Sequence, residues 1–250
     1  MRKNTFQQLA KSTFLLSALT LATQASATEV TFDTSEGTIV INLFDNDTPK
    51  TVTNFLSYVN NGSYNNSVIH RSIPGFIIQG GGYAFEGAFP LVKLPTMPSV
   101  VNEPVYSNRR GTISMAKIGG QPNSATNQWF FNLADNSANL DVNESGYTVF
   151  GQVTEGMDVI DKVAGFETCS DIPTIDFECA DTSTPSVETF VTIYSATISD
   201  TSIDSAAQLN PVKNISTDDS DNDKDSGGSL SIMSLLTLGL LSIGRGKLKK

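Results

Sequence analysis

Val68-Ile69-His70-Arg71-Ser72-Ile73-Pro74-Gly75-Phe76-Ile77-Ile78-Gln79-Gly80-Gly81-Gly82 is the most informative segment of this sequence. It holds two short apolar runs, 68–73 and 76–79, which are rich in β-branched and aromatic residues and therefore predict neighbouring strands. Pro74-Gly75 between them predicts a turn, because proline presets φ and glycine tolerates a positive φ. Arg71 lies inside this apolar patch, and a buried arginine is rare unless it is paired or has a function.

Two further blocks share the character of the first. One contains Gly111-Thr112-Ile113-Ser114-Met115-Ala116-Lys117 and residues 124–132, and the other spans 146–153 with Gly156-Met157-Asp158-Val159. Together the three blocks resemble the signature of the cyclophilins, the peptidyl-prolyl cis-trans isomerases, and most of all their bacterial exported branch. The resemblance runs from about residue 29 to residue 200. It implies a mainly β fold, a closed antiparallel barrel of about eight strands that is capped by two helices.

The resemblance also implies an active site. Arg71 is the expected catalytic residue, and Gln79 is expected to help orient it. The guanidinium of arginine is always charged and carries several N–H donors, so it can donate to the nitrogen of a twisted prolyl amide. The expected substrate-binding residues are Phe76, Ile77, Ala116, Lys117, Gln128, Phe130, Leu140 and Tyr147.

Simpler interpretations of these residues remain open. Phe76, Ile77 and Phe130 would be ordinary barrel core, Arg71 would form a buried ion pair, and His70 would only fill space in a strand. The sequence also departs from many eukaryotic cyclophilins, because Asn139 stands where they have a pocket tryptophan and Tyr147 where they have a histidine. Tyr147 fits the bacterial branch, whereas Asn139 puts tight cyclosporin binding in doubt.

Composition excludes several other classes of function. The chain of 250 residues has 16 Lys+Arg and 26 Asp+Glu, and seven of those cations lie in residues 1–27 and 228–250. The remaining body is strongly acidic, which argues against a nucleic-acid partner. His70 is the single histidine, so a His-rich metal centre is not expected, and neither a metal nor a cofactor is implied.

Periodicity predicts the main elements. Apolar residues alternate through 30–32 and 39–43 around Ser35-Glu36-Gly37, which predicts a hairpin with one buried face. Asp47-Thr48-Pro49 offers a helix cap and a first-turn proline before an amphipathic helix over 51–60. The polar segment 83–110 predicts a long surface loop. Further strands are expected over 111–115, 128–132, 148–153 and 188–198, and a second helix over 157–164.

Cys169 and Cys179 lie in an insertion, 167–185, that we do not expect in a typical cyclophilin. Two cysteines in an exported chain favour a disulfide, and the alternative of a redox pair lacks the Cys-x-x-Cys spacing.

The two ends differ in composition from the body. Residues 1–27 have a basic start, a short apolar run and an Ala-x-Ala end, which predict a secretory signal peptide rather than an uncleaved anchor. Residues 28–200 form the expected isomerase domain, and the acidic, polar segment 201–226 predicts a disordered linker, with calcium binding as a weaker alternative. Residues 227–250 read Gly-Gly, an apolar run and a basic end, and resemble the glycine-glycine sorting tails of Gram-negative bacteria. A permanent tail anchor is the alternative.

The sequence therefore predicts a monomeric peptidyl-prolyl isomerase that acts on proline-containing polypeptides during the folding of exported proteins. We expect it in the periplasm or at the cell surface of a Gram-negative bacterium, with a tail that contacts the membrane at least transiently. The alternative is a surface-tethered module that binds proline peptides, or a chaperone, with little turnover.

Overall fold

The computed structural model describes residues 28–180, 184–200 and 209–215. Their helices are α1 (Pro49–Asn60), α2 (Ser137–Leu140) and α3 (Met157–Ala164), with short 3₁₀ turns at Asn143–Ser145 and Val187–Thr189. The strands are β1 (Glu29–Thr34), β2 (Gly37–Leu43), β3 (Ser67–Val68), β4 (Arg71–Ile73), β5 (Ile77–Gly80), β6 (Tyr83–Ala84), β7 (Val92–Lys93), β8 (Thr112–Met115), β9 (Trp129–Asn132), β10 (Val149–Glu155), β11 (Thr168–Cys169), β12 (Ile172–Pro173) and β13 (Thr192–Asp200).

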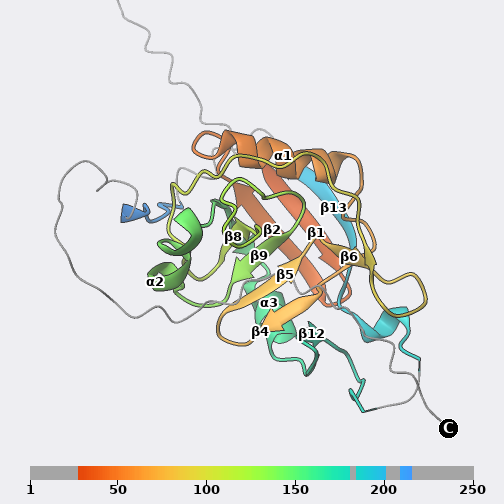
Figure 1. Cartoon of the computed structure of the whole chain (residues 1–250). Helices are drawn as coiled ribbons and strands as arrows, with labels where there is room; N and C mark the ends of the chain where they lie inside the picture. The colour runs from red at the N-terminus through yellow and green to blue at the C-terminus, as the bar shows by residue number, and fades with distance from the viewer. Residues whose placement is uncertain (1–27, 181–183, 201–208, 216–250) are drawn as a thin grey trace, which may run out of the picture.

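The strands form a curled antiparallel sheet. Its order is β4-β5-β9-β8-β10-β2-β1-β13-β3-β6-β7, and β11 pairs with β12 in a second small sheet. Figure 1 shows α1 above the sheet and α3 below it. The mainly β antiparallel architecture is thus confirmed. In the described part the large sheet has eleven strands, several of only two residues, and its order ends at β4 and β7, so it resembles a half-barrel rather than a fully paired ring.

The predicted hairpin is β1 and β2. Phe32 lies opposite Ile39 and Val30 opposite Ile41, and all four side chains are buried. Residues directly opposite on an antiparallel pair point to the same face, so the period-two pattern buries one face of this hairpin in the core.

Segment 68–82 folds differently from the prediction in one respect. The run 68–73 was expected to be one strand, but it changes partners in its middle. β3 pairs with β13 and β6, whereas β4 pairs with β5 across the turn at Pro74-Gly75. Gly75 has φ +71°, as the turn prediction requires. The break at Ile69-His70 lets the chain leave one side of the sheet and join the other.

Helix α1 begins at Pro49 as expected, but its predicted cap is wrong. Thr48 makes no side-chain capping bond, and its Oγ1 donates to the carbonyl oxygen of Phe44 instead. The carboxylate of Glu103 caps the helix, because it accepts the backbone N–H of Thr51 at 2.9 Å and that of Lys50 at 3.3 Å. A negative charge at this end also complements the helix dipole.

Trp129 on β9 is fully buried at the centre of the core. Its ring lies 5.1 Å from that of Phe32 on β1. The backbone of Gly81 runs against the indole: a Cβ there would lie 2.8 Å from Trp129 Nε1 and 2.5 Å from the carbonyl oxygen of Asn127, at φ +79°. Glycine at this position therefore allows the chain to turn from β5 into β6 without displacing the core tryptophan.

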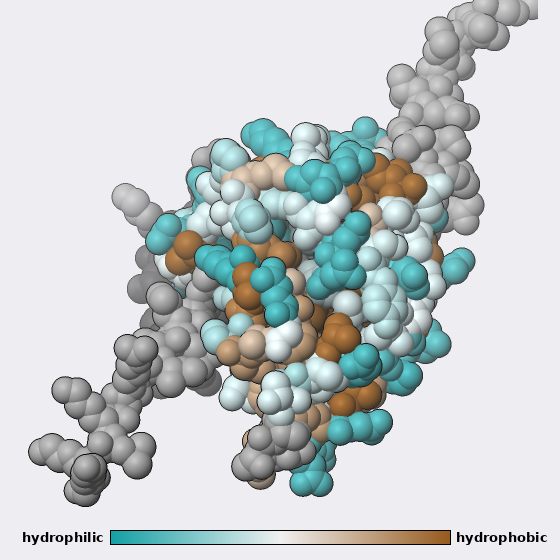
Figure 2. All heavy atoms as spheres, turned by 90° about the vertical axis from the view of Figure 1, so that its right-hand side faces the viewer, coloured by the Kyte–Doolittle hydropathy of each residue, from teal (hydrophilic) through white to brown (hydrophobic). Residues whose placement is uncertain are grey.

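The long loop predicted over 83–110 carries β6 and β7 but is otherwise irregular. The face seen in Figure 2 mixes hydrophobic and hydrophilic side chains in small separate groups. In the parts of the chain that the structure describes, every helix is too short or too polar to cross a bilayer.

The predicted leader and sorting tail lie outside the described residues, and so does most of the predicted linker. Residues 209–215 of that linker are described, and they dock on the domain. The backbone of Ser107 donates to Val212 O at 2.8 Å, and the backbone of Asn214 donates to Val105 O at 2.9 Å. The sequence alone did not indicate this contact.

Candidate active site

Arg71, Gln79 and Phe130 lie in line across three adjacent strands. Arg71 on β4 is the register partner of Gln79 on β5, and Gln79 is in turn the partner of Phe130 on β9. Such partners share one face of an antiparallel sheet. The side chain of Arg71 is 25% exposed, so the guanidinium is sheltered but reachable from solvent. The register therefore places a permanent cation on the same face as an aromatic ring two strands away, with Gln79 between them.

Gln79 and Gln128 form a buried polar pair next to this line. Gln79 Nε2 donates to Gln128 Oε1 at 2.7 Å, and both residues are 8% exposed. Because the Gln79 amide donates through nitrogen, its carbonyl oxygen is the atom that can accept a guanidinium N–H.

A hydrophobic cluster adjoins the polar pair and is separate from the main core, and we call it the apolar pocket for the role that the resemblance implies. Ile77, Phe130, Leu140 and Tyr147 are its buried members, and Phe76 and Ala116 pack against them. The rings of Phe130 and Tyr147 meet edge to face, with centroids 5.9 Å apart. The structure thus brings together the six apolar and aromatic residues that the resemblance assigned to substrate binding. Ile77 and Phe130 are each 1% exposed and belong to this cluster rather than to the larger core. Their substrate-binding role and the alternative of a core role both stay predictions.

The side chain of Lys117 packs against residues 144–147 at the edge of the apolar pocket. Its Nζ donates to the carbonyl oxygens of Glu144 and Gly146, each at 2.5 Å, and lies 4.7 Å from the centre of the Tyr147 ring. Burial lowers the pKa of Lys117 to about 8, although the charge of Glu144 opposes this shift. Burial also raises the pKa of Tyr147 to about 12. This lysine therefore braces the 144–147 segment with its side chain.

A second hollow of about 170 Å³ opens on the other side of Ala116 and Lys117. Lys93, Thr96, Ile118, Ser124 and Gln128 are among its lining residues. Ala116, Lys117 and Gln128 thus stand between this hollow and the apolar pocket, where an extended peptide could contact both.

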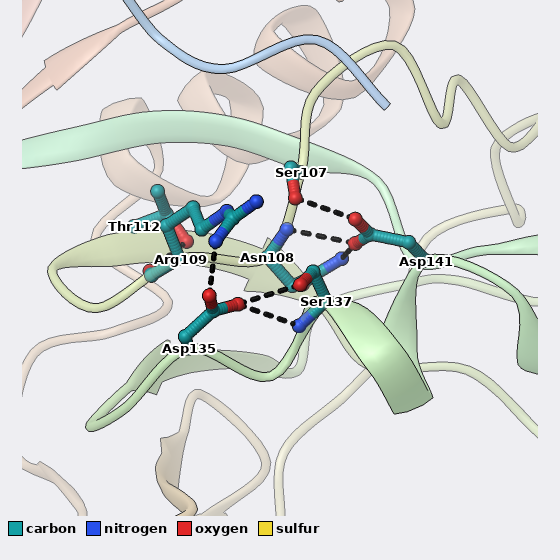
Figure 3. Close-up of polar contacts among 7 residues, drawn as sticks. All are labelled: Ser107, Asn108, Arg109, Thr112, Asp135, Ser137 and Asp141. Atoms are coloured by element: carbon teal, nitrogen blue, oxygen red, sulfur yellow. Dashed lines mark hydrogen bonds and ion pairs between the residues drawn. The ribbon is translucent and has the colours of Figure 1, made fainter. Parts of the chain in front are cut away.

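A buried hydrogen-bond network supports the pocket from behind (Figure 3). The carboxylate of Asp141 accepts from Ser107 Oγ at 2.5 Å, from the Asn108 backbone N–H at 2.8 Å and from Asn108 Nδ2 at 2.9 Å. Asn108 Nδ2 also donates to the carbonyl oxygen of Tyr147 at 3.2 Å. Asp141 directly follows Leu140, so this network fixes both Leu140 and Tyr147. Sequence reasoning did not identify these polar residues.

Asp135 fixes the start of α2 in the same region. Its carboxylate accepts from Ser137 Oγ at 2.6 Å and from the Ser137 backbone N–H at 3.1 Å, and it pairs with Arg109 (Figure 3). The hydrogen bonds from Ser137 lower the pKa of Asp135. Asn139, the residue that stands in place of a pocket tryptophan, is half-buried on this helix and accepts a hydrogen bond from Asn143 Nδ2 at 2.6 Å.

His70 packs beside the site, and its side chain interacts with Gln128 of the polar pair. Its ring meets that of Tyr83 edge to face, with centroids 4.8 Å apart. Burial lowers the pKa of His70 to about 4, and the neighbouring charge of Arg71 acts in the same direction. His70 is therefore neutral at physiological pH, and the interpretation that it only fills space stays a prediction.

The insertion contributes one charged neighbour to Arg71. The predicted disulfide between Cys169 and Cys179 is present, and the loop that it closes, 169–179, carries Asp171 in the turn between β11 and β12. Asp171 Oδ2 lies 3.7 Å from Arg71 Nε, and the side chain of Asp171 is 56% exposed. Arg71 is thus not locked to an internal carboxylate, because its acidic neighbour lies at the surface.

The sequence is similar to a known protein family. Residues 29–184 match the family described as "Cyclophilin type peptidyl-prolyl cis-trans isomerase/CLD". The chain is 45% identical over 143 residues to peptidyl-prolyl cis-trans isomerase B of Escherichia coli (strain K12), which covers 56% of this chain and 85% of that protein. It is 44% identical over 147 residues to peptidyl-prolyl cis-trans isomerase A of Dickeya dadantii (strain 3937), covering 57% and 74% of the two.

A solved structure shows the same fold. It is the crystal structure of a cyclophilin-type peptidyl-prolyl cis-trans isomerase of Cryptosporidium parvum in the presence of the dipeptide Ala-Pro. The TM-score is 0.52 at 24% sequence identity, and the match covers 69% of this chain and 99% of that one.

Proposed function

The chain belongs to the cyclophilin-type peptidyl-prolyl cis-trans isomerases, and from this premise we propose that Arg71 accelerates X-Pro isomerisation by stabilising the twisted amide. The alignment of Arg71, Gln79 and Phe130 across β4, β5 and β9 supports the proposal most directly. It sets a permanent donor beside a pocket of suitable character for a prolyl ring.

The barrier to be lowered is that of amide rotation, about 20 kcal/mol, and no bond to the substrate needs to form or break. At the top of the barrier the prolyl nitrogen has lost its resonance and carries a lone pair. A guanidinium N–H aimed at this lone pair stabilises the twisted state more than either planar state, which is the requirement for catalysis. One preorganised donor is worth about 3–4 kcal/mol, on the order of 10² to 10³ in rate.

The apolar pocket has a separate task in this mechanism. Ile77, Phe130 and Leu140 would hold the proline ring while the residue before it swings about the bond. Gln79 would accept from Arg71 and keep its guanidinium plane fixed. The main chain at Ala116 and Lys117, with Gln128, would position the peptide that carries the proline. Proline-containing polypeptides are the proposed substrates, in line with the Ala-Pro dipeptide of the Cryptosporidium parvum crystal.

We further propose that the enzyme assists the folding of exported proteins outside the cytoplasm. The signal-peptide pattern of residues 1–27 and the disulfide between Cys169 and Cys179 support this location, because disulfides persist in oxidising compartments. The sorting-tail pattern of residues 227–250 supports processing at the membrane followed by attachment to the surface or release.

Arg71→Ala tests the catalytic proposal in a prolyl-peptide isomerisation assay. We expect kcat/KM to fall by about 10² to 10³, with peptide affinity largely retained. Arg110→Ala is the matched control, because Arg110 is 48% exposed and pairs with Asp161 away from the pocket. It should leave the rate unchanged. Equal rates for wild type and Arg71→Ala, with peptide binding retained, would instead support a binding module with little turnover.

A further inference from the structure

The hairpin β11–β12, which the disulfide ties at Cys169 to Cys179 farther along the insertion, adjoins the edge of the sheet at Arg71. Figure 1 shows β12 beside β4, and β4 is the first strand in the sheet order. The backbone N–H of Ser72 donates to the carbonyl oxygen of Asp171 at 2.6 Å. The hairpin thus covers part of an edge strand that would otherwise present free backbone groups. It also places the Asp171 carboxylate 3.7 Å from Arg71 Nε.

The turn of this hairpin has a conformation that needs support. Ser170 and Asp171 have φ values of 53° and 68°, the left-handed pair of a two-residue hairpin turn. This conformation is unfavourable for residues with a Cβ, so the surrounding structure must hold it.

Three contacts supply that support. The Cys169–Cys179 disulfide closes a loop with a sequence separation of 10. The backbone N–H of Thr174 donates to Glu167 O at 2.9 Å, and Thr174 forms a bridge with Phe190. Asp171 is therefore held against Arg71 by the frame of the hairpin rather than by its own exposed side chain.

We propose that Asp171 is a positioning residue for Arg71 and that the disulfide maintains this role; the inference rests on the proposed function of Arg71. An arginine side chain has many rotamers, and a carboxylate on the Nε side limits the orientations of the guanidinium plane. The two terminal amino groups are then left to donate to a bound prolyl peptide. Because the benefit is greatest in the transition state, the effect belongs in kcat rather than in KM.

Substitutions at position 171 test the charge without removing the backbone contact to Ser72. We expect Asp171→Asn to lower kcat about three- to fivefold with KM unchanged, since a partly exposed ion pair has a modest effect. Asp171→Glu should restore part of the loss. Asp176→Asn is the matched control, because Asp176 is an exposed acid in the same loop with φ 48°. It should behave as wild type.

Two further measurements separate positioning from a structural effect. The advantage of wild type over Asp171→Asn should shrink as salt is added, because salt screens an exposed pair. Reduction by dithiothreitol transfers two electrons and two protons to the cystine, as the reagent closes to its cyclic disulfide. Reduced wild type should then match Asp171→Asn in kcat, and reduction of Asp171→Asn should add no further loss. Fluorescence of the buried Trp129 verifies that each variant is folded.

The outcomes distinguish this inference from the proposed function. In an Arg71→Ala background, Asp171→Asn should have no effect. If Arg71→Ala lowers the rate but Asp171→Asn leaves kcat unchanged, or if Asp176→Asn lowers it equally, the positioning role is refuted and the function of Arg71 stands. If Arg71→Ala itself leaves the rate unchanged, the proposed function fails.

Discussion

Asp141 offers the sharpest test of how the proline pocket is held. Its side chain is 7% exposed, and the carboxylate accepts from Ser107 Oγ, from the Asn108 backbone N–H and from Asn108 Nδ2. Asp141→Ala removes all three acceptor interactions and leaves a small void. Asp141→Asn keeps the shape and one acceptor oxygen. The pair of variants therefore separates the charge of Asp141 from its volume and hydrogen bonds.

The expected loss of unfolding free energy follows from the number of hydrogen-bond donors that lose Asp141 as their acceptor. After Asp141→Ala the Asn108 backbone N–H loses its partner, and each buried unsatisfied donor costs about 1–3 kcal/mol. Asn108 Nδ2 keeps its bond of 3.2 Å to Tyr147 O, and the Ser107 hydroxyl can rotate, so these two add less. With the void included, we expect Asp141→Ala to lower the free energy of unfolding by about 3–4 kcal/mol. Asp141→Asn should cost only about 1 kcal/mol, because the Ser107 hydroxyl can turn to accept from the new amide.

Urea unfolding measures both values, with Trp129 as the probe. It is the single tryptophan of the chain and is fully buried, so its fluorescence reports the loss of the core. The KM for a prolyl peptide should also rise in Asp141→Ala, because Leu140 in the pocket directly precedes it. A loss below about 1 kcal/mol for Asp141→Ala, or equal losses for the two variants, would refute the network as the support of the pocket.

Two further predictions concern the core and the pH dependence of stability. Gly81→Ala should lower the free energy of unfolding by about 3 kcal/mol or more, because its Cβ would meet Asn127 O and Trp129 at positive φ. Gly87→Ala should cost only about 1–2 kcal/mol, because Gly87 also has a positive φ, +86°, but open space around it. Equal losses of stability in the two variants would contradict the close approach of the Gly81 backbone to Asn127 and Trp129. His70 has a pKa near 4 in the folded state against 6.5 ordinarily, so the unfolded chain binds its proton first as the pH falls. The free energy of unfolding should therefore decline by roughly 3 kcal/mol as the pH falls from about 6.5 to about 4. If His70→Gln shows the same dependence of unfolding free energy on pH, the decline belongs to other groups.

Local sequence patterns predicted much of the fold and the pocket. The β1–β2 hairpin follows from strict alternation, and helix α1 from apolar spacing after a first-turn proline. The residues of the apolar pocket were predicted from the family resemblance alone, because Ile77, Leu140 and Tyr147 lie on separate elements and no local periodicity connects them. The disulfide was predicted because the chain has two cysteines and an N-terminal segment typical of a secretory signal peptide.

Contacts between distant segments account for what the sequence did not predict. Glu103 caps α1 from a residue 52 positions away from Thr51, so the local Thr48 signal was misleading. Asp141 and Asn108 are 33 positions apart, and nothing in their own neighbourhoods distinguishes them from solvent-exposed polar residues. The split of 68–73 into β3 and β4 also depends on which strands are available as partners, which an apolar run does not specify.

Two segments outside the typical pattern contact residues at or next to the site. The insertion brings Asp171 to Arg71, whereas Asn214 of the docked segment 209–215 donates from Nδ2 to the carbonyl oxygen of Asp141 at 3.2 Å. Residue 214 lies beyond the range that matches the family. A segment that only tethered the domain would have no need to bond a residue adjoining the proline pocket. Its contact with Asp141 therefore makes the segment 209–215 part of the frame that holds Leu140 and Tyr147.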